Sequence, residues 1–352
     1  MTSLQETISR VRPVSVTVRS LATQRLNSLA MPRRALGRLL ELAETLAAIC
    51  GTADIDRTLD PCLKRRVNLV MAADHGVAVE GVSQYPQAVT RAMVETILSG
   101  RASINALATT ANSSVVVVDM GVIGAKSWTA RDGFLDRRIA DGTDNMAVGP
   151  AMTRQQAVQS IEAGIEVAAS VDADVVGLGE MGIANTTAAT AIGCVLLGVD
   201  PMGATGSGTG LSSEAVKHKA SVIRRAIEIN GPDPNDGIDV LRTVGGFEIG
   251  GLVGAILGTA AFGKPIIIDG LISTSAVLIA HSLCPHVADW LIASHLSAEP
   301  LHQQMLNHLK IQAYLDLEMR LGEGTGAALM LPMLDAAAAL LKEVATLEEV
   351  LK

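Results

Sequence analysis

Five short runs along the chain are apolar at consecutive positions rather than at alternating ones. They cover residues 67–72 (VNLVMA), 115–119 (VVVVD), 174–177 (DVVG), 264–269 (KPIIID) and 289–294 (DWLIAS). Central strands of a parallel sheet show this pattern because both of their faces are buried. Segments with helical periodicity lie between the runs, at 88–110, 153–171, 184–198, 212–229, 246–262 and 271–283. The alternation predicts a doubly wound α/β domain with a mostly parallel sheet.

The two ends of the chain show helical patterns only. Residues 35–49 carry leucines spaced three and four apart, and residues 327–344 carry an alanine-rich apolar face. Neither end can bury such a face alone, so we expect the two to pack together as a small helical domain. The predicted division is a large α/β catalytic domain over residues 50–300 and a small domain built from 1–49 and 301–352.

Composition and charge exclude several classes of protein. The 352 residues are 49% hydrophobic but include only two Trp, two Tyr and three Phe, which leaves few platforms for stacking nucleic-acid bases. The net charge of −8 supplies no basic surface for phosphate backbones, so we expect no nucleic-acid partner.

The mean hydropathy of +0.35 does not predict a membrane protein. The apolar stretch 249–263 has 15 residues between Glu248 and Lys264, short of the roughly 18 that a spanning helix needs. The N-terminus shows no apolar secretory core. The cysteines Cys50, Cys62, Cys194 and Cys284 are widely spaced and predict buried free thiols. We therefore expect a cytoplasmic protein without membrane contacts.

Polar and glycine-containing segments follow the predicted strands. Ligands of open α/β sheets bind beyond the carboxyl ends of the strands, so these segments are the candidate site. A carboxylate is present in every one, which is typical of a small-molecule site. The segments are Asp74-His75-Gly76, Asp119-Met120-Gly121, Gly179-Glu180-Met181-Gly182, Asp269-Gly270 and His295-Leu296-Ser297-Ala298-Glu299.

One of these segments fits a dinucleotide-binding fingerprint. Residues 177–182 match GxGxxG between a predicted strand and a predicted helix, and Asp200 lies 18 residues after Gly182. An NAD-dependent oxidoreductase is therefore one hypothesis. Glu180 argues against it, because a carboxylate in that turn would repel a pyrophosphate. The alternative is a strand-to-helix turn that lets a ligand approach closely while Glu180 binds sugar hydroxyls.

Three further segments could bind an anion or move a proton. Asn185-Thr186-Thr187 opens a predicted helix as caps do, and helix N-termini attract anions. The glycine-rich turn 205–211 precedes a helix carrying Lys219, which could supply a point charge for one phosphate. Glu323 lies between Gly322 and Gly324, where it is either a helix cap or a desolvated general base. The seven histidines form no metal-ligand pattern, and no GxSxG motif indicates a serine hydrolase.

Taken together, these segments resemble the nicotinate-nucleotide:dimethylbenzimidazole phosphoribosyltransferase family, which makes the lower-ligand nucleotide of cobalamin. The match extends over nearly the whole chain in the expected order. The matching strings are LGRLLELAETLA (36–47), AADHGVAVEGVSQYPQAVT (72–90), VVDMGV (117–122), GTDNMAVGPAMTR (142–154), GEMGIANTTAATA (179–191), GGFEIGGLVGA (245–255), PIIIDGLIS (265–273), SHLSAEP (294–300) and RLGEGTGAAL (320–329).

The resemblance implies a homodimer whose large domain is Rossmann-like and whose small domain is built from both termini. It implies that nicotinate mononucleotide and a benzimidazole react to an α-linked ribotide and nicotinate, with no cofactor and no metal. In the family the glutamate at the position of Glu323 is the catalytic base. The resemblance assigns contacts with the ribose phosphate to Glu180 and Gly182, and a contact with the phosphate to Lys219. It places Asp269 at the nicotinate-ribose end and adds contacts from Ser297 and Ala298. The base pocket includes Tyr85, Met93 and Leu321.

Two matters stay open at this point. The chain has Tyr85 and Met93 where the enterobacterial pattern has Ser and Gln, so the preferred base could be dimethylbenzimidazole, another benzimidazole or a purine. Besides the oxidoreductase, the second rival is a non-catalytic homologue that only binds bases or nucleotides. The retained carboxylate of Glu323 argues against that rival.

Overall fold

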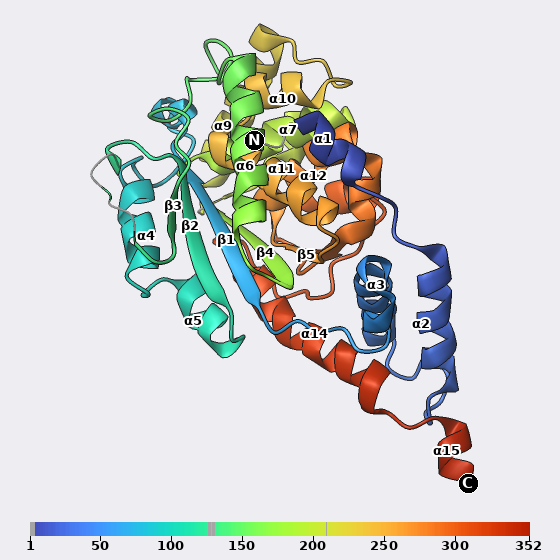
Figure 1. Ribbon diagram of the computed structural model, residues 1–352. Coiled ribbons are helices and arrows are strands. Elements are labelled where there is room, and N and C mark those ends of the chain that lie inside the picture. The colour runs from blue at the N-terminus through green and yellow to red at the C-terminus, as the bar shows by residue number, and fades with distance from the viewer. Residues whose placement is uncertain (1–3, 126–127, 129–130, 209) are drawn as a thin grey trace.

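A six-stranded parallel sheet forms the centre of the computed structural model, which describes residues 4–125, 128, 131–208 and 210–352. The strand order is β3-β2-β1-β4-β5-β6, and every neighbouring pair is parallel. This confirms the predicted fold class (Figure 1). The strands are β1 (Arg66–Ala73), β2 (Ser114–Gly121), β3 (Phe134–Asp136), β4 (Val175–Met181), β5 (Ile266–Ile268) and β6 (Leu291–Ala293).

The strand order places a topological switch between β1 and β4. The chain runs outward from β1 through β2 to the edge strand β3, then returns through α6 (Arg154–Ser170) to β4, on the other side of β1. The loops after β1 and β4 therefore leave in opposite directions. In such sheets the crevice beyond the carboxyl ends at this point is where ligands bind.

One face of the sheet is covered by α11 (Phe247–Ala261) and α12 (Leu271–Leu283), with α6 packed along α11 (Figure 1). Leu69 and Met71 of β1 join the core on this side, and Val70 and Ala72 join the core on the other. Both sets are buried, as expected for a central parallel strand. The predicted helices over 153–171, 246–262 and 271–283 are confirmed to within one residue at each end.

The opposite face is covered by α4 (Val89–Leu98), α5 (Ser103–Thr110) and the first turns of α14 (Thr325–Glu343). Our prediction of one helix over 88–110 is wrong, because the chain breaks after Ser99. Gly100 has a φ of 76°, in the left-handed region, and this residue ends the helical path. The break gives α5 its own N-terminus, directed toward the carboxyl ends of the strands.

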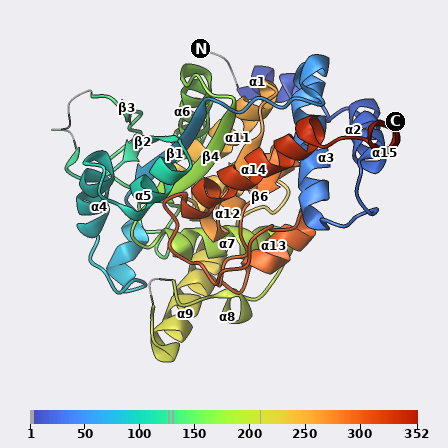
Figure 2. The ribbon, with the colours of Figure 1, turned by 90° about the horizontal axis from the view of Figure 1, so that it is seen from below.

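The two ends of the chain meet beside the sheet. α2 (Val16–Ser28) packs on α3 (Arg38–Ala53), and α14 crosses from the sheet to contact both helices (Figure 2). α1 (Leu4–Arg10) contacts α6 and α11 instead. The division into domains 50–300 and 1–49 plus 301–352 stays a prediction. The remaining helices are α7 (Asn185–Leu197), α8 (Pro201–Ala204), α9 (Ser213–Asn230), α10 (Gly237–Val244), α13 (His302–His308), α15 (Leu347–Leu351) and the 3₁₀ segments Ile55–Arg57, Gly76–Glu80 and Pro285–Trp290.

One helix in the described part of the chain is long and apolar enough to cross a membrane by length and composition alone. It is α14, and half of its apolar window is buried inside the protein, where it packs on β4 and α3. The four cysteines are free. Cys50, Cys194 and Cys284 are buried as predicted, and Cys62 is half-buried.

Glycines set the distance between α6 and α11. A Cβ at Gly164 would overlap the carbonyl oxygen of Gly251, and a Cβ at Gly254 would overlap that of Ile161. The two backbones therefore touch, and neither helix can accept a side chain at these positions. This contact fixes the layer that supports β1 and β4 from behind.

We predict that Gly254→Ala lowers the free energy of unfolding by about 1–3 kcal/mol, because the added methyl must push two backbones apart. Urea denaturation measures the change. Gly203→Ala is the control, since a Cβ at this exposed helical position meets nothing within 4 Å. Equal stability of the two variants would contradict the close packing of α6 and α11.

Candidate functional site

The candidate site lies beyond the carboxyl ends of β1, β4, β5 and β6. Four of the five predicted segments meet there, together with the turn 322–324 that precedes α14. The fifth, Asp119 after β2, has another role: its carboxylate accepts the N–H groups of Gly121 and Val122 and pairs with Arg138 at 2.6 Å. Asp119 thus holds its own loop in place.

The structure contradicts the dinucleotide fingerprint. Gly177 and Gly179 lie within β4, not in a turn after it. A Cβ at Gly177 would overlap the side chain of Asn68, and one at Gly179 would overlap the backbone of Glu323. Gly179 leaves room for the turn 322–324 against the strand, and Gly177 leaves room for Asn68 and Ala327, so neither glycine cradles a pyrophosphate. Our alternative of a turn open to a ligand is also wrong for both positions.

Glu323 lies in a left-handed turn. Gly322, Glu323 and Gly324 have φ values of 86°, 62° and 87°. Glycine adopts this conformation freely, but for glutamate it stores strain, which clusters at functional sites. The Glu323 side chain is 4% exposed, and its Oε2 accepts the N–H of Ile104 at 3.3 Å, at the N-terminus of α5. Burial raises the pKa of Glu323, and the Ile104 N–H opposes part of that rise.

Glu180, at the end of β4, lies against the same turn. A Cβ at Gly322 would overlap its Oε1, and its Oε2 accepts the side-chain N–H of Asn185. Burial raises the pKa of Glu180 to about 8; the Asn185 hydrogen bond opposes the rise, and the charges of Asp269, Glu248 and Glu323 add to it. The raised pKa favours the protonated form of Glu180, and in that form the carboxyl group can donate a hydrogen bond.

Asn185 is the first residue of α7, as predicted, but the interpretation of Asn185-Thr186-Thr187 as simple helix caps is wrong. The N-cap is Ala184, with φ 75° and no side-chain bond to the helix. Asn185 bonds to Glu180 instead, and the Thr186 hydroxyl accepts a hydrogen bond from Lys219 Nζ at 2.8 Å. The start of α7 therefore contributes side chains to the site.

Lys219 reaches the site from inside α9. It is fully buried, and burial lowers its pKa to about 8, with the Glu299 carboxylate opposing the fall. Glu299 Oε1 accepts the N–H of Gly208 at 2.8 Å, and its buried Oε2 has no hydrogen-bond partner among the described residues. The turn 205–208, Lys219 and Thr186 thus form one polar cluster. Thr209 of the predicted glycine-rich turn lies outside the described residues.

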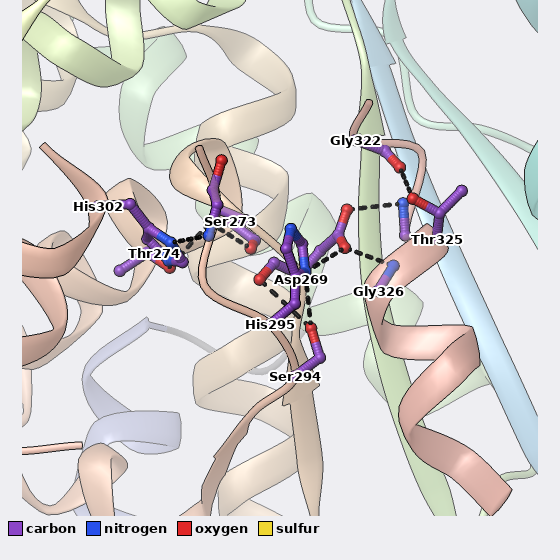
Figure 3. A network of polar contacts seen from close by, with 12 residues as sticks. Asp269, Ser273, Thr274, Ser294, His295, His302, Gly322, Thr325 and Gly326 are labelled. Carbon is purple, nitrogen blue, oxygen red and sulfur yellow. Dashed lines mark hydrogen bonds and ion pairs between the residues drawn. The ribbon is translucent and has the colours of Figure 1, made fainter. Parts of the chain in front are cut away.

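Both carboxylate oxygens of Asp269 bind the protein's own backbone. Oδ1 accepts the N–H of Gly326 at 2.7 Å and Oδ2 that of Gly324 at 3.0 Å, so Asp269 holds the start of α14 (Figure 3). Burial raises its pKa to about 7, while the N–H groups of Gly326, Gly324 and Ala327 oppose the rise. His295 Nδ1 lies 3.5 Å from Oδ1, and burial lowers the pKa of His295 to about 4.

A cavity of about 20 Å³ lies among these groups. This volume is enough for a water molecule, and far below the hundreds of Å³ that bind organic ligands. An organic ligand must therefore displace part of its wall. The lining residues are Glu180, Thr186, Gly270, Leu271, Ile272, His295, Ser297, Glu299, Arg320 and Gly322. A larger cavity, of about 610 Å³, lies elsewhere, between α3 and the segment 308–314, and contains none of the predicted residues.

The other predicted site residues differ in how far they are buried. Gly182 is buried, and so is Ser297, whose N–H donates to His302 Nδ1 at 2.9 Å. Ala298, Tyr85 and Leu321 are exposed, with the last two at 51% and 56%, and Met93 is half-buried. The exposed three lie at the surface, whereas Glu180, Lys219, Asp269 and Glu323 are buried.

One buried pair was not predicted from the sequence. His75 Nε2 lies 2.7 Å from Glu248 Oε1, and both side chains are at most 1% exposed. Burial alone would lower the pKa of His75, but the carboxylate of Glu248 raises it above its usual value. The two residues are 173 positions apart, so no spacing could reveal the pair. Among the described residues, no group of three or more His, Cys, Asp or Glu side chains could hold a metal ion.

The chain is similar to known proteins over almost its full length. A family model described as "Phosphoribosyltransferase" matches residues 11–350. The relatives named nicotinate-nucleotide–dimethylbenzimidazole phosphoribosyltransferase include one from Syntrophotalea carbinolica, 52% identical, and one from Desulforamulus reducens, 46% identical; each alignment covers 99% of this chain and 98% of the relative. A crystal structure of the Thermus thermophilus protein of that name superimposes with a TM-score of 0.88 at 39% identity, covering 96% of this chain and 98% of that one.

We predict that Glu180→Gln stabilises the protein at alkaline pH. Because the folded-state pKa of Glu180 is about 8, against 4.5 as the ordinary value, its favourable contribution is full below pH 4.5 and is lost as the pH rises through 8. A neutral amide avoids that loss. The gain in unfolding free energy at pH 9 should be about 2–4 kcal/mol, shrinking toward zero by pH 5.

Denaturation of both proteins at pH 5 and pH 9 measures this difference. The exposed Glu214→Gln variant is the control, since Glu214 lies at the surface of α9. A Glu180→Gln variant whose stability relative to the parent does not change with pH would rule out a protonated, buried Glu180.

Proposed function

We propose that this chain, which belongs to the nicotinate-nucleotide–dimethylbenzimidazole phosphoribosyltransferase family, has the activity for which the family is named. It transfers the ribose 5-phosphate of nicotinate mononucleotide to a benzimidazole-type base. The products are an α-ribotide (α-ribazole 5′-phosphate) and nicotinate, and the ribotide serves assembly of the cobalamin nucleotide loop. The observation that carries the proposal is Glu323, a buried carboxylate with a raised pKa in a strained turn.

Glu323 acts as the general base. One ring nitrogen of the benzimidazole forms the new bond to C1′ of the ribose, while the other ring nitrogen carries a proton. Glu323 accepts that proton as the bond forms, so the product is neutral at the ring. A raised pKa makes the carboxylate a better proton acceptor near neutral pH. The bond from C1′ to the pyridinium nitrogen breaks with its electron pair passing to nitrogen, and nicotinate leaves as a neutral pyridine ring.

Attack from the face opposite the leaving group explains the change from a β- to an α-linkage. The ribose carbon gains positive charge in the transition state, which nearby carboxylates stabilise. Glu180, in its protonated form, donates a hydrogen bond to a ribose hydroxyl and so adds little charge to that stabilisation. Gly182, Ser297 and Ala298 contribute further contacts with the ribose phosphate.

Lys219 binds the phosphate. Its ammonium is buried beside Thr186 and the turn 205–208, and a phosphate there would keep it charged. The small cavity must open for this, since its wall includes Arg320 and Gly322. Opening that wall and placing a nucleotide under the turn 322–324 would bring C1′ within reach of Glu323.

The acceptor base binds between the loop of Tyr85, helix α4 with Met93, and Leu321. Tyr85 and Leu321 are exposed, so the base enters from solvent. The protein acts as a homodimer in the cytoplasm. The non-catalytic alternative is disfavoured by the buried Glu323, and the oxidoreductase by the place of Gly177 and Gly179 inside β4.

We predict that Glu323→Gln lowers kcat by about 10²–10⁴-fold, because the amide cannot accept the proton. The release of nicotinate from nicotinate mononucleotide and dimethylbenzimidazole measures turnover, and calorimetry should show nucleotide binding unchanged. The exposed Glu318→Gln is the control, five residues away on the same segment. Wild-type turnover of Glu323→Gln at neutral pH would refute the general-base role.

Lys219→Ala should weaken the binding of nicotinate mononucleotide by about 10–100-fold while leaving base binding nearly unchanged, since a charge-assisted contact is lost. Titration with each substrate separates the two effects. Lys217→Ala is the control because Lys217 is exposed on the same helix. Equal losses for both substrates would show that Lys219 does not contact the phosphate.

A further inference from the structure

Asp269 contacts the backbone immediately after Glu323, on both sides of Thr325. Its two carboxylate oxygens accept the N–H groups of Gly324 and Gly326, at 3.0 and 2.7 Å. Asp269 is 2% exposed, so these bonds are shielded from water. Figure 3 shows the carboxylate directed at the start of α14, with His295 and Ser294 close to it.

The turn needs such an anchor. Three consecutive residues, 322–324, are in the left-handed region, where the Glu323 backbone is sterically strained. The first N–H groups of α14 have no partner within the helix, and burial without a partner would be costly. The carboxylate of Asp269 accepts two N–H groups at this helix start. Since the backbone at Gly179 leaves no room on the opposite side of the turn, the position of Glu323 is determined from two directions.

Asp269 is itself held firmly. It follows β5, where Ile268 pairs with Ala293 of β6. The Ser294 hydroxyl donates to the Asp269 carbonyl at 3.4 Å, and His295 Nδ1 lies 3.5 Å from Oδ1. Gly326 leaves space for this arrangement, since a Cβ there would overlap both the His295 ring and the Asp269 carboxylate. The carboxylate therefore cannot turn toward the cavity without losing its contacts with Gly324, Gly326 and His295.

We propose that Asp269 is a positioning residue for Glu323 rather than a contact of the nicotinate ribose. The inference rests on the proposed role of Glu323 as general base. The next residue, Gly270, lines the small cavity. The end of β5 therefore fixes both the wall of the nucleotide site, through Gly270, and the turn that carries Glu323, through Asp269. This arrangement sets the distance between the ribose and the carboxylate that removes the proton.

The test is Asp269→Asn in the full chain. The amide keeps one acceptor oxygen but directs an NH₂ at a backbone N–H, so one bond to the turn becomes a repulsion. We expect kcat to fall by about 10–100-fold, as misplacement of a catalytic group does, with the KM for nicotinate mononucleotide changed by no more than about threefold. Hydrogen exchange of the amides at Gly324 and Gly326 should become faster.

Asp236→Ala is the matched control. Asp236 caps α10, where its Oδ1 accepts the N–H groups of Ile238 and Asp239, away from the site. It should lower the melting temperature without changing kcat. If Asp269→Asn does not fold, Ser294→Ala removes only the hydroxyl that steadies Asp269, and a loss of about 3–10-fold in kcat with unchanged KM is expected.

Two results would overturn the inference. A raised KM with unchanged kcat would make Asp269 a substrate contact, and unchanged exchange at Gly324 and Gly326 would show that the turn does not depend on it. The proposed function fails separately: if Glu323→Gln keeps its turnover, the general-base role is lost whatever Asp269→Asn does. Loss of turnover in Glu323→Gln with a normal Asp269→Asn would leave the function standing and remove only the positioning role.

Discussion

The structure depends on burying several carboxyl groups together at the carboxyl end of one parallel sheet. Glu180, Asp269 and Glu323 are each at most 6% exposed, and each has a pKa raised by burial. Their like charges add to this effect, since the charges of Asp269 and Glu323 raise the pKa of Glu180 and the charge of Glu323 raises the pKa of Asp269. Such an arrangement is unfavourable for stability but suited to proton transfer.

Each carboxyl group is tolerated because the fold supplies it with a donor from a different element. Glu323 accepts the N–H of Ile104 from α5, Glu180 accepts from Asn185 of α7, and Asp269 accepts from the start of α14. These elements come together because β1, β4 and β6, the strands that precede them, belong to one parallel sheet and end at the same edge of it. The same contacts therefore maintain the fold and the candidate site: Gly179 of β4 leaves room for the turn 322–324, and this turn positions Glu323.

The sequence predicted the features that depend on local patterns. Runs of consecutive apolar residues identified all the longer strands, and the segments that follow these runs identified most of the candidate site. β3 was missed because its three residues, FLD, form no apolar run. The break between α4 and α5 depends on Gly100, which a periodicity of 3.6 residues passes over. The role of Glu323 came from family resemblance, since a glutamate between glycines alone fits a cap as well as a base.

What the sequence could not predict are contacts between distant segments. The pair of His75 and Glu248, the bonds from Asp269 to the start of α14, and the place of Gly179 against Glu323 each join residues whose spacing carries no signal. The GxGxxG match suggested the wrong function for the same reason. In the sequence, a glycine that leaves room for a neighbouring segment of the chain cannot be distinguished from a glycine that leaves room for a phosphate.

The most direct test of the account is the product formed from nicotinate mononucleotide and 5,6-dimethylbenzimidazole by the wild-type protein. Proton NMR of the reaction gives both the amount of free nicotinate and the configuration at C1′ of the new ribotide. We predict equal amounts of nicotinate and an α-configured ribotide. Nicotinate released without any ribotide, a β-configured product, or no reaction at all would contradict this prediction.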